Sequence, residues 1–259
     1  MSPTPTPVPG HGLLAGKVVV VTAAAGTGIG FATAERCAEE GAVVVVSDAH
    51  ERRLSEAADR LGDRFGTRPL AVACNVTVEE EVQALYRAAV AEHGRLDVAV
   101  NNAGLGGTVS LVEMTDDQWQ AVLEVTLTGT MRCTRAALRI MYDQGQGVVV
   151  NNASVLGWRA QAGQAHYAAA KAGVMALTRC AAAEAASKGV RVNAVSPSLA
   201  LHPFLNRAIS DEELEKLRQR ELFGRSAETW EVANVVVFLA SDYSSYMSGE
   251  VVSVSSQHP

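Results

Sequence analysis

Three side chains in one short stretch of the sequence could carry out proton transfer: Ser154, Tyr167 and Lys171. Tyr167 and Lys171 stand four residues apart in an Ala-rich run, which favours a helix and places both side chains on one of its faces. We expect the Lys171 ammonium to favour the phenolate and to lower the pKa of Tyr167 below its ordinary value of about 10. A phenol with a lowered pKa can act as a general acid or base near neutral pH.

Ser154 follows the apolar run Val148–Val150, at the expected end of a strand, where its hydroxyl could hydrogen-bond the same substrate oxygen. Taken alone, the Tyr-x-x-x-Lys pair would be interpreted as a solvated pair on a helix, because so short a motif also arises by chance. The elements around these residues must therefore decide whether they form a site.

Short Val-rich runs alternate with helical patterns from Lys17 to the end of the sequence. Runs that are apolar on both faces are typical of a parallel sheet covered by helices on both sides. The alternation predicts a single-domain, Rossmann-type, doubly wound α/β fold with about seven strands. The predicted strands are Lys17–Thr22, Val43–Ser47, Leu70–Cys74, Leu96–Asn101, Gly147–Asn152, Val190–Ser196 and Glu250–Val254.

Helix ends are predicted from capping residues and glycines. A Thr followed three residues later by Glu or Gln predicts a capping box at a helix start. Two such pairs occur, Thr77 with Glu80 and Thr115 with Gln118. Glycines predict the ends of three helices, at Gly41, Gly94 and Gly189.

Two stretches depart from the alternation. Residues 1–12 contain alternating Pro, which predicts a flexible, extended tail ahead of one catalytic domain over residues 13–259. Residues from about 199 to 225 include a charged helical run, DEELEKLRQR. Because ligands bind beyond the carboxyl ends of the strands in such folds, we expect this stretch to form a lid over the substrate.

Composition excludes several classes of partner. The net charge is −6 and no basic block occurs, so nucleic acid and anionic membrane are not expected partners. No apolar run reaches the roughly 20 residues that span a bilayer, and the first residues lack the pattern of a signal peptide. The four cysteines are scattered without a CxxC pair, which predicts reduced thiols, no metal site and a cytoplasmic protein.

The stretch Thr22–Gly30, TAAAGTGIG, follows the first predicted strand and opens the first helix. Its glycines, Gly26, Gly28 and Gly30, would let the backbone approach a pyrophosphate at a helix N-terminus. A Gly-rich turn alone is weak evidence, but the order of strand, turn and helix favours a dinucleotide site.

Asp48 ends the second predicted strand, where an acid can bond the ribose hydroxyls of the cofactor and repel a 2′-phosphate. This position favours NAD over NADP. The alternative is that Asp48 caps a helix over His50–Arg60. The neighbouring Arg52 and Arg53 keep NADP possible.

Asparagines follow the third and fourth predicted strands. Asn75 could contact the adenine edge or simply close a turn. Asn101 and Asn102 precede Ala103 and Gly104, next to the expected place of the nicotinamide ribose. Asn side chains also satisfy backbone groups in loops, so a structural role and a binding role both stay open.

Taken together, these motifs resemble the short-chain dehydrogenase/reductase family over nearly the whole chain after the tail. The resemblance rests on the Gly-rich loop, NNAG at 101–104, Ser154, YAAAK at 167–171 and RVNAVSP at 191–197. Ser154 and Tyr167 are thirteen residues apart, as they are in the family.

The resemblance implies a mechanism. Tyr167 would donate or accept a proton, Ser154 would position the substrate oxygen, and Lys171 would bind the nicotinamide ribose and tune the tyrosine. Hydride would pass between the nicotinamide and a carbinol carbon. The cofactor, NAD with NADP possible, would contact Thr22, Ala24, Gly26, Thr27, Gly28, Ile29, Gly30, Asp48, Asn75, Val76, Asn102, Ala103, Gly104, Tyr167, Lys171, Pro197 and Leu199.

The sequence departs from the family pattern at four places. Ala23 replaces the first Gly of the loop, which also has one extra residue. Thr126 occupies the position of an Asn that, in the family, helps a water to relay a proton to the lysine. The Thr126 hydroxyl could hold that water, so Thr126 is a further catalytic candidate. Ser198 replaces the Gly of SPG, and the Thr that often follows is missing. The stretch SSQHP at 255–259 replaces a Gly-Gly.

With these departures, the sequence is similar to a smaller actinobacterial subgroup. The members of this subgroup look like the reductases or dehydrogenases of steroid ring breakdown, which act on a hydroxy-indanone carboxyl-CoA thioester. The resemblance therefore implies a CoA thioester as the small-molecule substrate. It also implies a homo-oligomer, a dimer or tetramer that pairs the fourth and fifth helices across subunits.

Four residues are candidates for the substrate pocket besides Ser154. Trp158 offers a flat apolar wall, or else packs between subunits, and Gln161 offers a polar contact. His202 falls where the missing Thr would be, and Phe204 beside it could line the pocket or pack the lid.

Two other functions stay open. One is a 3-oxoacyl thioester reductase that uses NADPH, which Asp48 disfavours. The other is a sensor that binds nucleotide without turnover, which the altered Thr126 and Ser198 suggest and the intact Ser154, Tyr167 and Lys171 disfavour.

Overall fold

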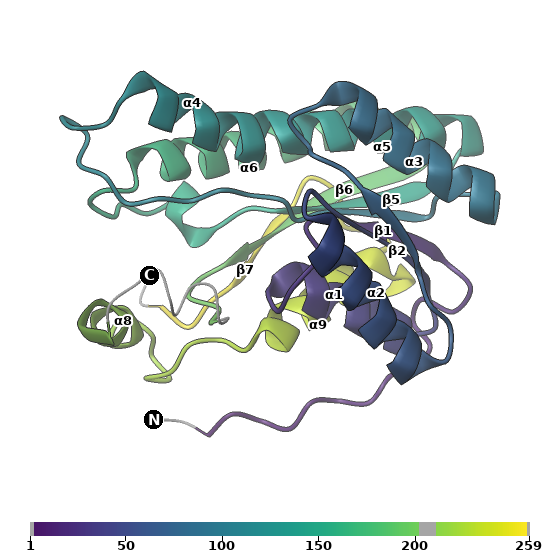
Figure 1. Cartoon of the computed structure of the whole chain (residues 1–259), viewed down its shortest axis with the longest axis horizontal. Helices are drawn as coiled ribbons and strands as arrows, with labels where there is room; N and C mark the ends of the chain where they lie inside the picture. The colour runs from purple at the N-terminus through teal and green to yellow at the C-terminus, as the bar shows by residue number, and fades with distance from the viewer. Residues whose placement is uncertain (1–2, 202–210, 258–259) are drawn as a thin grey trace.

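The structure, a computed structural model, describes residues 3–201 and 211–257. Within these residues seven parallel strands form one sheet in the order β3-β2-β1-β4-β5-β6-β7 (Figure 1). The order reverses between β1 and β4, which is the position at which doubly wound folds bind ligands. The strands are β1 (Val18–Val21), β2 (Val43–Asp48), β3 (Leu70–Ala73), β4 (Val98–Asn101), β5 (Gly147–Asn152), β6 (Val190–Pro197) and β7 (Val251–Val254).

The central strand β1 illustrates why the sheet forms from these residues. It consists of four buried valines, and β-branched side chains pack well on a pleated surface. Val19 and Val21 face one hydrophobic core, whereas Val20 faces the other. A strand that is buried on both faces must be apolar at every position, so the continuous valine run is explained and the predicted doubly wound fold is confirmed.

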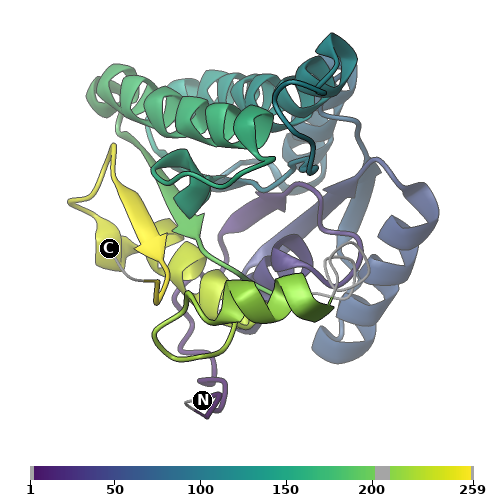
Figure 2. The same ribbon diagram turned by 90° about the vertical axis from the view of Figure 1, so that its left-hand side faces the viewer.

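Helices cover both faces of the sheet (Figures 1 and 2). One face carries α1 (Ile29–Glu39), α2 (Glu51–Phe65) and α9 (Thr229–Ala240). The other face carries α3 (Glu79–His93), α5 (Gly129–Gln144) and α6 (Ala165–Ala185). Ahead of α5, the helix α4 (Asp116–Leu123) continues through the short π-helix η1 (Glu124–Thr128).

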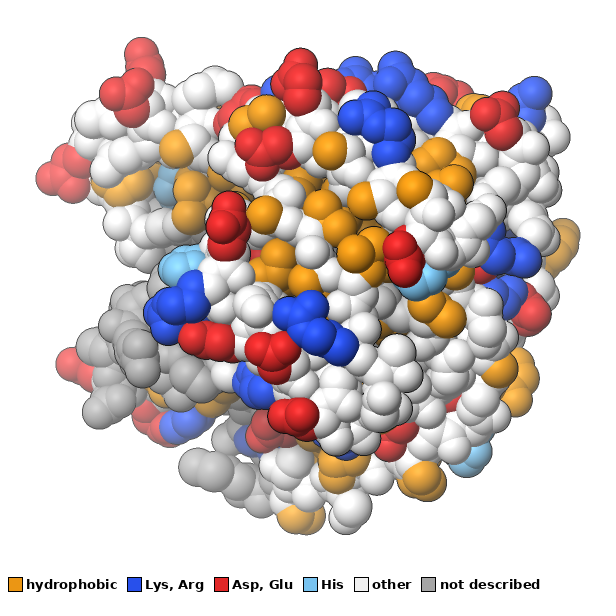
Figure 3. All heavy atoms as spheres, turned by 45° about the vertical axis from the view of Figure 1, so that its right-hand side comes forward, with side chains coloured by type: hydrophobic (Ala, Val, Ile, Leu, Met, Phe, Trp, Pro, Cys, Tyr) orange, Lys and Arg blue, Asp and Glu red, His pale blue; other side chains and the backbone are white. Residues whose placement is uncertain are grey.

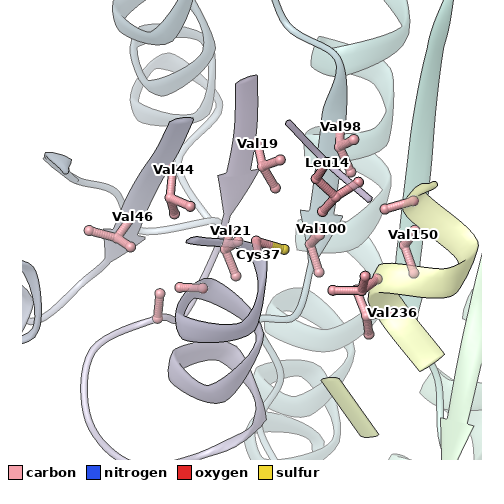
Figure 4. Packing of buried hydrophobic residues seen from close by; sticks show 14 of the residues in the cluster. Leu14, Val19, Val21, Cys37, Val44, Val46, Val98, Val100, Val150 and Val236 are labelled. Carbon is pink, nitrogen blue, oxygen red and sulfur yellow. The ribbon is translucent and has the colours of Figure 1, made fainter. Parts of the chain in front are cut away.

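Figure 4 shows the core on the side of α1 and α9. Val19 and Val21 of β1 lie between Val44 and Val46 of β2 on one side and valines of β4 on the other. Branched side chains at close-packed positions leave few voids, and about 1.5–3 kcal/mol of transfer free energy is typical for each fully buried aliphatic side chain. This packing holds the loops at the carboxyl ends of the strands.

One of the two predicted capping boxes is confirmed. Thr115 accepts a hydrogen bond from the Gln118 N–H, and the Gln118 side chain accepts one from the Thr115 N–H. The box predicted at Thr77 with Glu80 is wrong, because α3 begins at Glu79. The Thr77 hydroxyl and N–H both donate to Asn75 Oδ1, at 2.9 and 3.1 Å, so the side chain closes the preceding turn instead of capping the helix.

The Pro-rich segment is held to the domain before residue 13. The buried carboxylate of Glu40 accepts hydrogen bonds from the N–H groups of His11 and Leu13, both at 2.9 Å. The Arg36 guanidinium pairs with the same carboxylate at 2.6 Å. The last residues of the stretch predicted as a flexible tail, residues 1–12, are therefore attached to the C-terminal end of α1.

A buried polar network joins β4 to β5. Asn101 donates to Asn151 Oδ1 at 2.9 Å and to the Thr134 hydroxyl at 3.1 Å. Asn151 in turn donates to the Thr178 hydroxyl at 3.0 Å, and the Tyr86 hydroxyl donates to Asn101 Oδ1. A buried polar group is costly without partners, so this network fixes the register of the two strands that carry the site.

The two ends of the predicted lid are paired. Ala227 donates its N–H to the Leu199 carbonyl, and Leu201 donates its N–H to the Ala227 carbonyl. The helix α8 (Asp211–Arg218) lies between these ends in the sequence. Residues 202–210, which include the predicted pocket residues His202 and Phe204, lie outside the described residues.

The outer surface mixes charges of both signs. Figure 3 shows basic and acidic side chains interspersed over the face in view. Among the helices of the described ranges, none combines the length and the apolar character needed to cross a membrane.

Arg191 on β6 closes the C-terminal end of α9. Its guanidinium donates to the carbonyls of Leu239 and Ser241, at 3.1 and 3.0 Å, and to the Ser244 hydroxyl at 3.0 Å. The last carbonyls of a helix have no partner within the helix, and a cation there also interacts favourably with the helix dipole.

We predict that Arg191→Met lowers the free energy of unfolding by about 2–3 kcal/mol, because buried carbonyls lose a charged donor. Urea denaturation at a fixed protein concentration measures the change. Arg87→Met is the matched control, since Arg87 on α3 is exposed and makes no ion pair or side-chain hydrogen bond to any residue that the structure describes. Equal stability of the two variants would contradict this role of Arg191.

Candidate active site

Ser154, Tyr167 and Lys171 converge beyond the carboxyl end of β5. Ser154 follows β5 and forms the N-cap of the short helix η2 (Val155–Gly157), accepting a hydrogen bond from the Leu156 N–H at 3.2 Å. Tyr167 and Lys171 lie on the first turns of α6, and the Ser154 side chain lies beside the Tyr167 phenol and affects its pKa. The Lys171 Nζ lies 5.6 Å from the centre of the Tyr167 ring. The structure thus brings together the three residues that the sequence singles out.

The electrostatics of Tyr167 differ from the expectation. Burial raises the pKa of the phenol above its ordinary value, and the hydrogen bond with Ser154 opposes that shift only in part. The prediction that Lys171 lowers the pKa of Tyr167 is therefore wrong for this structure. The reason is that desolvation disfavours the phenolate more than the neighbouring groups favour it.

Lys171 is itself strongly perturbed. The side chain is buried, and burial lowers the pKa of the ammonium to about 7. Its Nζ donates to the Asn152 carbonyl at 2.5 Å. An ammonium whose pKa lies near 7 carries only a partial charge at neutral pH, which explains why it does not dominate the titration of Tyr167.

Thr126 lies in the π-helix η1, where an extra residue enters the helical turn. Its hydroxyl accepts a hydrogen bond from the Leu105 N–H at 2.9 Å and donates one to the Leu105 carbonyl at 3.0 Å. The only proton of the hydroxyl is therefore used to hold the loop after β4, and the structure gives Thr126 no contact with Lys171. Gly104 lies between them, since a Cβ there would stand 3.5 Å from Lys171 Nζ and 3.8 Å from Thr126 Oγ1.

Contacts from neighbouring strands hold the Gly-rich loop. The Thr22 hydroxyl accepts hydrogen bonds from the N–H groups of Asn102 and Ala103, at 3.0 and 3.2 Å, and the Ala24 N–H donates to the Ser47 carbonyl. Asn102 also donates to the carbonyls of Thr22 and Ala23 and accepts from the Asn152 amide. The loop, β4 and β5 are thus joined by one set of hydrogen bonds.

Ala23 has a left-handed backbone, with φ of 51°, which L-residues other than Gly adopt at a cost of roughly 1–2 kcal/mol. It stands where the family pattern has Gly. Gly30 packs against it so closely that a Cβ at residue 30 would lie 2.2 Å from the Ala23 carbonyl oxygen and 2.5 Å from Asn102 Nδ2. Only glycine fits at position 30.

The start of α1 fits an anionic dinucleotide. Gly28 provides no side-chain cap, and the first turn of α1 contains no acidic residue. The N-terminal N–H groups and the positive end of the helix dipole therefore face the loop without a side-chain acceptor. By contrast, α3 and α4 have acidic first turns. This arrangement suits the pyrophosphate of a nicotinamide dinucleotide.

Asp48 supports the loop from the end of β2. Its carboxylate accepts hydrogen bonds from the Ala25 N–H at 3.2 Å and from the His50 N–H at 2.9 Å. The N-cap of α2 is His50, so Asp48 does not cap this helix as the alternative interpretation required. Arg52 pairs with Glu56 and is exposed.

The remaining predicted cofactor residues have varied environments. Asn75 closes the turn before α3 through its side-chain oxygen, and Val76 is buried against Gly129 of α5. Pro197 ends β6, and the Leu199 carbonyl accepts a hydrogen bond from the Ala227 N–H at 2.8 Å. Thr27 and Ile29 lie at the turn into α1.

Of the predicted pocket residues within the described ranges, Trp158 is half exposed and Gln161 lies in the same loop, between η2 and α6. The loop after β4 covers this region, since a Cβ at Gly106 would lie 3.7 Å from the Tyr167 ring. His166 is buried and accepts the Tyr167 N–H at 2.9 Å through Nδ1.

Sequence reasoning missed two residues. Asn152 contacts two other residues of the site: its backbone carbonyl accepts a hydrogen bond from Lys171, and its side-chain amide donates one to Asn102. A signal existed, because a second NN pair stands at the end of β5, as the first stands at the end of β4. Arg60 donates to the Gly26 carbonyl at 2.5 Å and stacks on Phe31, and nothing in the sequence indicates this contact.

Comparison with known proteins agrees with this geometry. The family described as enoyl-(acyl carrier protein) reductase matches residues 23–256. The chain is 62% identical over 260 residues to the (5R,7aS)-5-hydroxy-7a-methyl-1-oxo-2,3,5,6,7,7a-hexahydro-1H-indene-carboxyl-CoA reductase of Mycobacterium tuberculosis, covering 100% of this chain and 99% of that protein. It is 39% identical over 241 residues to a 3-oxoacyl-[acyl-carrier-protein] reductase of Vibrio cholerae, with 93% and 96% coverage.

A solved structure is similar throughout. The short chain dehydrogenase from Mycobacterium smegmatis superposes with a TM-score of 0.89, at 59% identity and 99% coverage of both chains.

We predict that burial of Lys171 gives the protein a distinctive pH dependence of stability. The lysine pKa is about 7 when folded and 10.5 in its unperturbed form. Between these values the unfolded chain binds more protons than the folded one, so the free energy of unfolding rises with pH. Relative to Lys171→Met, the wild type should gain about 2 kcal/mol between pH 7 and pH 9.

Urea denaturation of both proteins at pH 7, 8 and 9 measures this difference, and Tyr167→Phe serves as the control that keeps the lysine. A difference that stays constant across this range would mean that Lys171 titrates like an exposed lysine.

Proposed function

The chain belongs to the short-chain dehydrogenase/reductase family and is an oxidoreductase, and on this premise we propose that it interconverts a secondary alcohol and a ketone on an alicyclic CoA thioester, with NAD as the cofactor. The observation that carries this proposal is the convergence of Ser154, Tyr167 and a buried Lys171 beyond β5, beside a loop suited to a dinucleotide. When bound, the nicotinamide would supply or take up the hydride.

In this proposal Tyr167 transfers the proton of the substrate oxygen. The raised pKa keeps the phenol protonated at neutral pH, which suits donation to the alkoxide that forms as a ketone is reduced. Ser154 orients the same oxygen, because its side chain lies beside the Tyr167 phenol and lowers the pKa of that phenol in part. The contact with the Leu156 N–H fixes the direction of the Ser154 side chain.

Lys171 has two proposed tasks. Its Nζ would bind the nicotinamide ribose, and it would also return a proton to Tyr167 after transfer. A pKa of about 7 supports the second task, since a group that gains and loses protons near neutral pH can pass one on. Thr126 is left out of this route because its hydroxyl proton is held by the Leu105 carbonyl. We propose instead that Thr126 positions the loop at Gly104.

The choice of NAD over NADP rests on Asp48. Its carboxylate is held in place by two N–H donors at the end of β2, next to the Gly-rich loop. A fixed anion there would accept hydrogen bonds from the ribose hydroxyls and repel a 2′-phosphate. The cofactor residues named from the sequence, from Thr22 to Leu199, stay proposals in the same sense.

The substrate class comes from similarity. The Mycobacterium tuberculosis relative is named as a reductase of a bicyclic hydroxy-ketone carboxyl-CoA, and it matches over the whole chain. Trp158, half exposed beside the site, offers an apolar face for such a ring, and Gln161 a polar contact. The second candidate is a 3-oxoacyl thioester reductase, which the Vibrio cholerae relative favours and Asp48 disfavours. A sensor without turnover is disfavoured by the intact Ser154, Tyr167 and Lys171.

We also propose that the protein is a homo-oligomer that pairs α5 and α6 across subunits. A surface groove between these helices is lined by apolar residues and by charges of both signs, which could pair across a two-fold axis. The lining residues include Met131, Leu138, Leu177, Arg135, Arg139 and Glu184.

We predict that the wild type reduces NAD with an alicyclic hydroxy-CoA thioester and that Tyr167→Phe lowers kcat by about 10²–10⁴-fold, the usual contribution of a general acid or base. Absorbance of the reduced nicotinamide follows turnover, and NADH fluorescence measures cofactor affinity, which should not change. Tyr246→Phe, at a fully exposed tyrosine, is the control. Full activity of Tyr167→Phe would rule out this mechanism, and turnover only with straight-chain 3-oxoacyl thioesters would favour the second candidate.

For the cofactor, Asp48→Asn should lower the ratio of kcat/KM for NAD to that for NADP by about tenfold or more, because the charge that repels a 2′-phosphate is lost. Glu51→Gln is the matched control, since Glu51 is a neighbouring carboxylate on the same surface that does not contact the loop. Wild-type turnover with NADP alone would overturn the role assigned to Asp48.

A further inference from the structure

Glu221, at the end of the lid, is a buried carboxylate with an unusual set of partners. It is 4% exposed and accepts hydrogen bonds from the Ser256 hydroxyl at 2.8 Å and from the Gln257 amide at 3.0 Å. The N–H groups of Ser256 and Leu199 donate to it at 3.3 and 3.4 Å. In the described part of the chain, all of these donors are neutral. A buried anion is costly unless its oxygens are occupied, so Glu221 holds the segment that follows β7 firmly against the lid.

Gln257 connects this carboxylate to a cation on another loop. Its side-chain oxygen accepts a hydrogen bond from Arg159 Nη1 at 2.7 Å, while its nitrogen donates to Glu221. A guanidinium can only donate and a carboxylate can only accept, so the two partners fix the orientation of the amide. We call these two contacts the Gln257 bridge.

Arg159 lies at the end of the turn that carries Ser154. The N–H groups of Trp158 and Arg159 both donate to the Val155 carbonyl at 3.0 Å, and the Gly157 N–H donates to the Ser154 carbonyl at 2.9 Å. Gly157 lies against α6, where a Cβ would stand 2.6 Å from the Met175 methyl group. The turn is therefore held by α6 on one side and by the Arg159 side chain on the other.

We propose that Gln257 and Glu221 are positioning residues for catalysis. The Gln257 bridge joins the end of the lid to the turn between Ser154 and Trp158, and so fixes the Ser154 hydroxyl and the Trp158 face relative to the lid. The described part of the lid at residues 211–224 lies far in the sequence from the turn at residues 154–159. The bridge is a polar link between them, and it passes through the segment after β7. The inference rests on the proposed function only for its kinetic readout.

This role is distinct from simple stabilisation. The segment 255–257 already pairs with the lid through the backbone, since the Leu222 N–H donates to the Ser256 carbonyl at 2.6 Å. The side chain of Gln257 is not needed for that contact. Loss of the side chain should therefore loosen the Ser154 turn while the lid stays attached.

The test compares Gln257→Met, which keeps the size of the side chain and removes both hydrogen bonds, with the wild type. Hydrogen–deuterium exchange is followed at the amides of residues 156–159 and 221–222. Turnover is measured with NAD and the alicyclic hydroxy-CoA thioester, and NADH affinity by fluorescence. Arg220→Met is the matched control, an exposed residue next to Glu221 whose side chain has no hydrogen bond or ion pair to the residues described.

For Gln257→Met we expect faster exchange at residues 156–159 and unchanged NADH affinity. The KM for the thioester should rise about tenfold, which corresponds to the loss of one hydrogen bond to a charged group. Arg159→Met should have the same effect on exchange at residues 156–159, and the double variant should be no worse there than either single variant, because both changes break the same Arg159–Gln257 contact. Gln257→Glu should not restore the bridge, because its carboxylate can still accept from Arg159 but places a second acceptor of like charge against the Glu221 carboxylate.

Unchanged exchange at residues 156–159 in both Gln257→Met and Arg159→Met would overturn the proposal, and so would effects of the two variants that simply add. If the wild type fails to turn over any thioester, the proposed substrate is wrong, but the exchange comparison still decides the role of the bridge.

Discussion

Two pairs of asparagines at the ends of β4 and β5 are the contacts on which the site depends. Asn101 bonds to Asn151 inside the core, and Asn102 bonds to Asn152 one residue further along, where the strands emerge. The inner pair fixes the register through partners on α3, α5 and α6. The outer pair extends that register to the Gly-rich loop, through Asn102, and to Lys171, through the Asn152 carbonyl. A slip between these strands would break the cofactor loop and the proton-transfer residues together, because the same amides hold both.

Burial then determines the chemistry of what these strands hold. Tyr167 and Lys171 lose solvation together, and each shifts toward its neutral form, the phenol upward in pKa and the ammonium downward. The two shifts give the groups different protonation behaviour: the phenol keeps its proton, and the amine exchanges one near pH 7. A pair of this kind is suited to protonating a substrate oxygen and to being recharged afterward. The geometry alone, four residues apart on a helix, would not distinguish this from an ordinary surface pair.

The sequence predicts the fold and the centre of the site because both depend on local patterns. Valine runs, glycine ends and the spacing of Ser154, Tyr167 and Lys171 are visible without contacts, and the seven strands follow the predicted order of elements. The errors arise where a neighbouring side chain or burial competes with the expected interaction. The Thr77 hydroxyl finds Asn75 Oδ1 before it can cap α3, and desolvation overrides the effect of Lys171 on Tyr167. Contacts between residues far apart in the sequence, such as Arg60 with Gly26 or Glu40 with the Pro-rich segment, leave no local pattern, so the spacing of residues does not predict them.

The places where the chain departs from the pattern of its family also have physical counterparts in the structure. Ala23 keeps the left-handed backbone that Gly would adopt freely, and Gly30 packs against its carbonyl. Thr126 lies in a π-helix, and its short side chain bonds the Leu105 backbone, a contact that holds the loop after β4 close to Lys171. The residues that replace the usual Gly-Gly provide Ser256 and Gln257, the partners of Glu221. A Gly-Gly pair has no side chain with which to satisfy a buried carboxylate, so Glu221 and the altered segment after β7 depend on each other. Ala23, Thr126 and the altered segment after β7 therefore do not indicate a decaying site, because each takes part in contacts around an intact Ser154, Tyr167 and Lys171. The fourth departure, Ser198, differs, since its buried hydroxyl has no hydrogen-bond partner among the described residues.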